Sequence, residues 1–115
     1  MANTFKLVTK AGVTSADVIY TVASSTTTDV LGIMLGNTTT SQVTATVTLD
    51  TNTGSRAGNN DESNQAVELV TNAPIPSGSS LELLAGNKVV METTDALKLT
   101  ASGATDITVS IMEIT

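Results

Sequence analysis

The sequence predicts an all-β protein: an antiparallel β-sandwich, jelly-roll-like or immunoglobulin-like, with about eight or nine short strands. Thr makes up about one-fifth of the 115 residues, whereas helix formers such as Glu, Lys, Arg and Gln are sparse. β-Branched residues suit a pleated, half-buried surface. Turn signals separate short alternating segments about every 8 to 12 residues, which is typical of a sandwich or barrel. We therefore expect residues 1–115 to form a single domain.

The first two predicted strands lie near the N-terminus. Residues 3–9 alternate Phe5 and Leu7 with Thr4, Lys6 and Val8, and residues 1–10 could instead form an N-terminal arm. Residues 17–23 form the second predicted strand. Tyr20 alternates there with apolar residues, so we expect its ring in the core and its hydroxyl at the rim.

Residues 29–36, DVLGIMLG, are apolar on both faces, with Val30 and Met34 on one side and Leu31, Ile33 and Leu35 on the other. This pattern predicts a strand covered on both sides, by a sheet and by a neighbouring subunit, with a short buried helix as the rival. Gly32 disfavours the helix and indicates a bulge or a close backbone contact.

Residues 42–50, QVTATVTLD, show the clearest alternation in the chain. The period of two predicts one face in the core and one in solvent. The expected inner set is Val43, Ala45, Val47 and Leu49, and the expected outer set is Thr44, Thr46 and Thr48. The Thr face could bind a repetitive surface, although β-propensity alone also explains it. With residues 29–36, this segment is expected to form a hairpin.

The C-terminal half contains shorter predicted strands, over residues 66–71, 81–84 and 88–92. Pro74 and Pro76 break a hydrogen-bonded ladder and indicate a crossover or a sheet edge. Residues 95–114 are expected to form a second hairpin around a Ser-Gly turn. Its apolar alternation comprises Leu97, Leu99, Ile107, Val109 and Ile111.

Residues 51–64 form the longest predicted loop, because Ala57 is the one apolar residue among them. Long loops in compact domains are often functional or disordered. Asp61 and Glu62 are adjacent there, but nothing apolar is near enough in sequence to raise a carboxyl pKa. We therefore expect a solvated pair and not the tuned acid and base of a glycosidase.

Metal and phosphate sites are not predicted. Asp50, Asn52 and Asp61 loosely suggest a calcium loop, but the glycine falls at Gly54 and not at position 55, and no helices flank the loop. Neither G-x-G-x-x-G nor G-x-x-x-x-G-K is present. The sequence therefore predicts no cofactor.

The residue inventory also disfavours an enzyme. The absence of His and Cys removes imidazole acid–base chemistry, the Ser-His-Asp triad and thiolate nucleophiles. Glu82, Glu92 and Asp95 are interpreted as ordinary strand-surface or turn carboxylates. We expect no catalytic, cofactor-binding or metal-ligating residues.

Charge, hydropathy and aromatic content disfavour three classes of partner. A net charge of -6, a pI near 4.2 and one Phe and one Tyr disfavour nucleic-acid binding, which needs cations and stacking rings. So few aromatics also disfavour carbohydrate binding. No apolar stretch is long enough for a membrane span, and no signal peptide is evident, so synthesis in a cytoplasm is expected.

Self-association is expected because the core is thin. The chain has no disulfide, no predicted metal and almost no aromatic residues, and small cores of this kind are often completed by oligomerisation. The apolar character of both faces of residues 29–36 indicates the same. We expect a homotrimer.

Several short motifs resemble those of small β-sandwich virion proteins of tailed bacteriophages, especially phages of marine bacteria and cyanobacteria. They are PSGSSL at 76–81, TDALKLTA at 94–101 and SIMEI at 110–114, together with the opening MANT and the strand pair within 29–50. Each motif is short, but together they extend over most of the chain.

The resemblance implies a non-enzymatic virion component assembled in the host cytoplasm. The function expected from it is a capsid decoration or cement protein that binds and stabilises the head shell through the major capsid protein. The alternative is a neck or tail-fibre, receptor-binding module. Because decoration proteins bind shells through N-terminal arms or loops, residues 1–10 and 51–64 are the candidate contacts.

Overall fold

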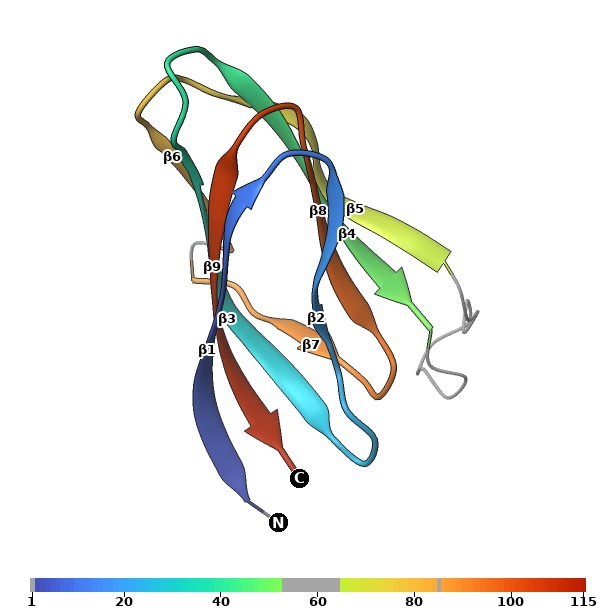
Figure 1. Ribbon diagram of the computed structural model, residues 1–115. Coiled ribbons are helices and arrows are strands. Elements are labelled where there is room, and N and C mark those ends of the chain that lie inside the picture. Colours follow the sequence, from blue (N-terminus) through green and yellow to red (C-terminus); the bar gives the residue numbers. More distant parts are fainter. Residues whose placement is uncertain (1, 53–64, 85) are drawn as a thin grey trace.

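The computed structural model describes residues 2–52, 65–84 and 86–115, which form two antiparallel β-sheets packed face to face (Figure 1). The five-stranded sheet has the order β1-β9-β3-β6, with β7 also paired to β3, and the four-stranded sheet has the order β2-β8-β4-β5. The strands are β1 (Asn3–Val13), β2 (Ala16–Thr21), β3 (Thr27–Asn37), β4 (Val43–Thr51), β5 (Gln65–Ile75), β6 (Ser80–Leu83), β7 (Val89–Met91), β8 (Ala96–Ala101) and β9 (Thr105–Ile114). The predicted all-β sandwich is confirmed. Within the described ranges, no helix is long and apolar enough to cross a membrane.

The core lies between the two sheets and comes from alternate residues of the long strands. Because side chains alternate across a strand, every second residue of β4, β8 and β9 points inward, and most of these residues are buried. The main buried side chains are Val30, Ile33, Leu35, Val43, Ala45, Val47, Leu97, Leu99, Ile107, Val109 and Ile111. The alternation predicted for residues 42–50 and 95–114 therefore describes the inward faces correctly.

Both predicted hairpins are wrong. β3 pairs with β9, β6 and β7, whereas the next strand, β4, belongs to the other sheet and pairs with β5 and β8. In the same way, β8 lies in the four-stranded sheet and β9 in the five-stranded sheet. Each pair faces across the core, because alternation specifies which side of a strand is buried and not which strand is its hydrogen-bonding neighbour.

The predicted irregularity near Gly32 is a β-bulge. The register of β3 on β9 shifts between Val30 and Gly32, so Leu31 is the extra residue. The shift places Val30 on the buried side with Ile33, and the predicted grouping of Val30 with the exposed Met34 is therefore wrong. A Cβ at Gly32 would meet no atom within 4 Å, so the glycine is not there for a close backbone contact.

Buried polar side chains tie the two sheets together. The Nδ2 of Asn37, at the end of β3, donates to the carbonyl oxygens of Ser41 and of Ile75 in the other sheet, both at 2.8 Å. Its Oδ1 accepts from the backbone N and the hydroxyl of Thr39, each at 2.8 Å. The donor and acceptor groups of the Asn37 side-chain amide are thus satisfied by hydrogen bonds, although the residue is almost completely buried.

The N-terminal segment lies within the five-stranded sheet. Residues 3–10, considered above as an arm, belong to β1, which pairs with β9 from Asn3 opposite Ile114 to Val13 opposite Thr105. β1 is an edge strand of its sheet. Beyond it, Ala2 and Thr115 exchange two backbone hydrogen bonds of 3.1 and 2.9 Å, so the two ends lie side by side (Figure 1).

Candidate interaction surface

The outward side of the five-stranded sheet is rich in apolar residues. Directly paired residues place their side chains on the same side of a sheet. Phe5 pairs with Met112, Met112 with Asp29, and Asp29 with Val90, so these four form one row across the sheet. A second row runs through Leu7, Ser110 and Gly32, and a third through Thr9, Thr108, Met34 and Glu82. We call this surface the apolar face.

Large side chains on the apolar face are strongly exposed. Phe5 keeps 72% of its surface in solvent, Leu7 63%, Val90 55% and Met34 48%. In β1 the inward positions include Val8, which packs on the core, so Phe5 and Leu7 point away from it. Contiguous exposed apolar side chains on a soluble protein usually mark a contact with another molecule.

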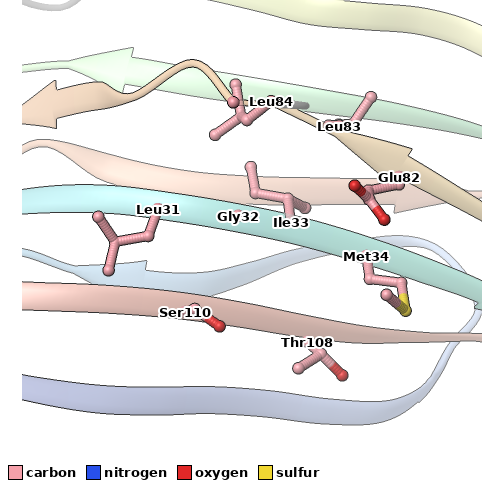
Figure 2. A pocket seen from close by; sticks show the side chains of 10 residues that line it. Leu31, Gly32, Ile33, Met34, Glu82, Leu83, Leu84, Thr108 and Ser110 are labelled. Carbon is pink, nitrogen blue, oxygen red and sulfur yellow. The ribbon is translucent and has the colours of Figure 1, made fainter.

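A hollow of about 200 Å³ lies in the apolar face over β3, β6 and β9 (Figure 2). The hollow forms at Gly32 and Ser110 because glycine has no side chain and serine has a small one. Leu31, Met34 and Leu84 form apolar sides, and Figure 2 shows Glu82 and Thr108 near one end. The hollow is large enough for one apolar side chain, since cavities of about 150 Å³ hold benzene.

The charges near the hollow are acidic. Asp29, Glu82 and Asp106 occupy outward positions in β3, β6 and β9. The two cations of β1 take the opposite parity, because Lys6 pairs with Ile111 and Lys10 with Ile107. Lys6 Nζ lies 2.7 Å from a Glu113 carboxylate oxygen, and Lys10 Nζ lies 3.7 Å from Asp17. Among the described strand residues, the apolar face therefore carries acids without a cation.

The outward side of the four-stranded sheet is polar. Thr46 pairs with Thr100, and Thr48 pairs with Lys98. Lys98 is 3.9 Å from Asp50, and the hydroxyl of Thr46 accepts a hydrogen bond from the backbone N of Asn72. The predicted outward Thr row is thus confirmed, and we call this surface the polar face.

A polar cluster joins the sheets beside the core. The hydroxyl of Tyr20 in β2 donates to Glu113 Oε2 at 2.6 Å and is 2.7 Å from Thr28 Oγ1. Glu113 also forms an ion pair with Lys6, so the cluster connects β1, β3 and β9 to the opposite sheet. Tyr20 packs partly on the core with its hydroxyl in this cluster, as the sequence predicts.

The cluster shifts two pKa values in opposite directions. Desolvation by burial, followed by the hydrogen bond to Glu113, raises the pKa of Tyr20 to about 12. The hydrogen bond from Lys6, followed by that from Tyr20, lowers the pKa of Glu113 below its usual value of 4.5. Glu113 therefore stays ionised and Tyr20 stays neutral at physiological pH.

The contact segments proposed from sequence are only partly described. Residues 3–10 form most of β1 and place Phe5 and Leu7 on the apolar face. Of residues 51–64, Thr51 ends β4 and Asn52 follows it, whereas residues 53–64, with Gly54, Asp61 and Glu62, lie outside the described residues.

The carboxylates considered as ligands or catalysts do not converge within the described ranges. Asp50 faces Lys98, and the backbone N of Asn52 donates to Asp95 Oδ1 at 2.8 Å. Asp95 is a turn residue, as expected, but it is buried, and its Oδ2 accepts from the backbone N of Glu92. No group of three or more potential metal ligands occurs among the described residues.

Sequence reasoning did not identify the apolar face as a surface. The alternation of Phe5 and Leu7 was visible, but the pattern cannot tell an outward apolar row from an inward one. The apolar character of both sides of residues 29–36 was the usable signal, and β3 does expose Met34 on its outward side. The neighbouring subunit expected to cover that side stays a prediction.

Comparisons with known proteins bear on the fold. No protein-family model matches the chain, and no curated protein matches it. A solved structure of Bacillus endospore appendages, described as a novel family of disulfide-linked pili, is similar with a TM-score of 0.48 and 15% identity over 99% of this chain and 87% of the other. A structure from the T13 IBDV viral particle is similar with a TM-score of 0.50 and 9% identity over 96% of this chain and 35% of the viral chain. At this identity the viral match shows a shared fold.

Proposed function

We propose that this protein is a non-enzymatic structural component of a virion, a capsid decoration or cement protein that binds and stabilises the head shell. The apolar face carries the proposal. In the single chain, Phe5, Leu7, Met34 and Val90 are exposed to solvent. Assembly with a partner would bury these side chains and so gain the free energy of removing apolar surface from water.

Two further observations support this assignment. The sequence holds no His and no Cys, which removes the commonest acid–base and nucleophilic groups of enzymes. The β-sandwich also resembles the fold of a viral capsid chain. The resemblance of several short motifs to those of tailed-phage virion proteins makes the phage head the proposed location, after synthesis in the host cytoplasm.

The proposed partners are the major capsid protein and further copies of this chain. A homotrimer is the assembly expected from the thin core. Neither cofactor nor metal is required, and neither nucleic acid nor membrane is a proposed partner, because the surface is acidic and poor in aromatic residues.

Immunogold electron microscopy of virions that carry an epitope-tagged chain tests the proposal. Label spread over the head is expected. Label at one vertex or on the tail would reject decoration in favour of the neck or tail-fibre alternative. Label absent from virions that infect normally would reject a virion role altogether. A tag placed after Thr115 extends from the end of β9.

A further inference from the structure

We propose that the apolar face is the interface between copies of this chain, with Leu7 of one copy seated in the Gly32–Ser110 hollow of another. This inference rests on the self-association included in the proposed function and specifies its surface. The occupant is a second copy because the face has the area, the protruding side chain and the hollow that such a contact needs.

The area of the face matches that of a stable interface. Four strand positions at about 4.8 Å spacing, and eleven residues at about 3.3 Å, give a surface of roughly 700 Å². A standard protein–protein interface buries about 800 Å² on each partner. Two apolar faces packed together therefore reach the size of a specific dimer contact, at the sheet separation of about 10 Å that sandwiches use.

The protruding and hollow parts lie in one row of the sheet. Leu7 pairs with Ser110 on one side of β9, and Gly32 pairs with Ser110 on the other. A two-fold axis along β9 would therefore bring Leu7 of each copy over Gly32 of the other. The hollow of about 200 Å³ can accept a Leu side chain. A two-fold contact of this kind joins two copies, so a homotrimer would need a second, different contact.

The acidic charge of the chain gives the contact a characteristic salt dependence. Each copy carries a net charge of -6 at pH 7, so two copies repel one another as they associate. Such repulsion is weakened as the Debye length falls from about 30 Å at 0.01 M to about 10 Å at 0.1 M salt. Self-association should therefore tighten with added NaCl, whereas a contact with a basic partner would loosen.

Sedimentation equilibrium over a concentration series tests the interface directly. The wild-type chain is expected at a multiple of its 11.7 kDa mass. Leu7→Lys, which removes the protruding side chain, and Ser110→Gln, which fills the hollow from its floor, should each raise the dissociation constant at least about tenfold. Both positions are exposed, so circular dichroism should report an unchanged fold.

Val18→Lys is the matched control, because Val18 is a 52% exposed residue of another edge strand, β2, but on the polar face. It should leave the mass unchanged. A wild-type monomer at about 100 μM, or equal weakening by Val18→Lys and Leu7→Lys, would overturn the interface. So would weaker association at higher salt. Immunogold label on the head with a monomeric chain would overturn this inference alone, and a normal oligomer with no label on virions would overturn the proposed function alone.

Discussion

The two sheets of this sandwich share one core but present opposite surfaces to solvent. On the four-stranded sheet, the residues that alternate with the core are Thr46, Thr48, Thr100 and Lys98, which water solvates well. On the five-stranded sheet the equivalent positions include Phe5 and Met34, which water solvates poorly. The inner faces are alike because both must fill the same space.

The difference teaches which part of the sequence serves folding and which serves assembly. Inward alternation is needed for any stable sandwich. Outward apolar residues add little to the stability of one chain, since they remain hydrated in it. Phe5, Leu7, Met34 and Val90 lie on the outward side of the five-stranded sheet, whereas Val18 is the exposed large apolar residue on the outward side of the other. This concentration on the five-stranded sheet is better explained by a partner surface than by folding.

The largest expected effect tests the claim that the inner faces are equivalent. Val109→Asp in the five-stranded sheet and Leu97→Asp in the four-stranded sheet each bury an unpaired charge among apolar side chains. Each should cost more than about 4 kcal/mol and prevent folding, as measured by circular dichroism and solubility. Thr108→Asp and Thr100→Asp, at exposed positions of the same strands, are the controls and should fold. A soluble, cooperatively folded Val109→Asp would contradict the assigned inner face.

A smaller loss is expected from cutting the link between the sheets at Asn37. Asn37→Ala removes the side-chain bonds to Ser41, Ile75 and Thr39 and leaves buried backbone groups without these partners. We expect a loss of about 2–4 kcal/mol in the free energy of unfolding, measured by urea denaturation. Thr38→Ala, which loses one exposed hydroxyl bond to Ala104, is the control and should cost less than about 1 kcal/mol. Equal effects of the two substitutions would show that Asn37 is not a link of this kind.

The connection from β8 to β9 should be the next most sensitive point. A Cβ at Gly103 would lie 2.8 Å from Cγ1 of Val43, which cannot move away without disturbing the core. Gly103→Ala is therefore expected to cost about 1–3 kcal/mol. Gly36→Ala, in β3 with no atom within 4 Å of its Cβ, is the control and should be nearly neutral. Comparison of the two melting temperatures measures the difference, and an unshifted Gly103→Ala would reject the close contact.

The smallest effects concern the polar cluster and depend on pH. Tyr20→Phe removes two hydrogen bonds and should cost about 1 kcal/mol at neutral pH. The pKa of Tyr20 is about 12 in the folded chain and 10 in the unfolded chain, so its contribution is complete below pH 10 and is lost as the pH rises toward 12. Wild type should therefore lose more stability than Tyr20→Phe over this interval.

The acid limb has the opposite sign. The folded pKa of Glu113 is below its ordinary value of 4.5, so its contribution is present above that pH and is lost as the pH falls through the lowered pKa. Glu113→Gln should therefore flatten the acid limb of a stability–pH curve obtained from urea titrations. The cluster would not link the sheets if two results held together. The Tyr20→Phe curve would run parallel to wild type on the alkaline limb, and the Glu113→Gln curve would run parallel to wild type on the acid limb.

The strands were predictable from sequence, but their partners were not. Period-two alternation located the segments that became β4, β8 and β9 and chose the inward residues of β4 and β9 correctly, although Leu49 is only partly buried. Pro74 also predicted a sheet edge, and it lies in β5, an edge strand. These features are local, so they can be read from neighbouring residues.

The pairing of the strands depends on contacts far apart in sequence. Nothing in residues 29–50 distinguishes a hairpin from two strands that face one another across a core, since both bury the same alternate residues. The bulge at Leu31 placed Val30 on the same buried side as Ile33, and Gly32 was the feature of the sequence that indicated a bulge. The apolar face required the sheet order, because Leu7 and Gly32 are neighbours only through Ser110.

The backbone pairing between Ala2 and Thr115 makes the fold suitable for circular permutation. A short peptide linker could join these two positions without crossing the apolar face or stretching either strand. New ends could then be opened at the exposed turn around Gly78, between β5 and β6. A protein fused to the new termini would extend from the turn between β5 and β6 and not from the end of β9. In the permuted chain, β1 and β9 would form one continuous hairpin.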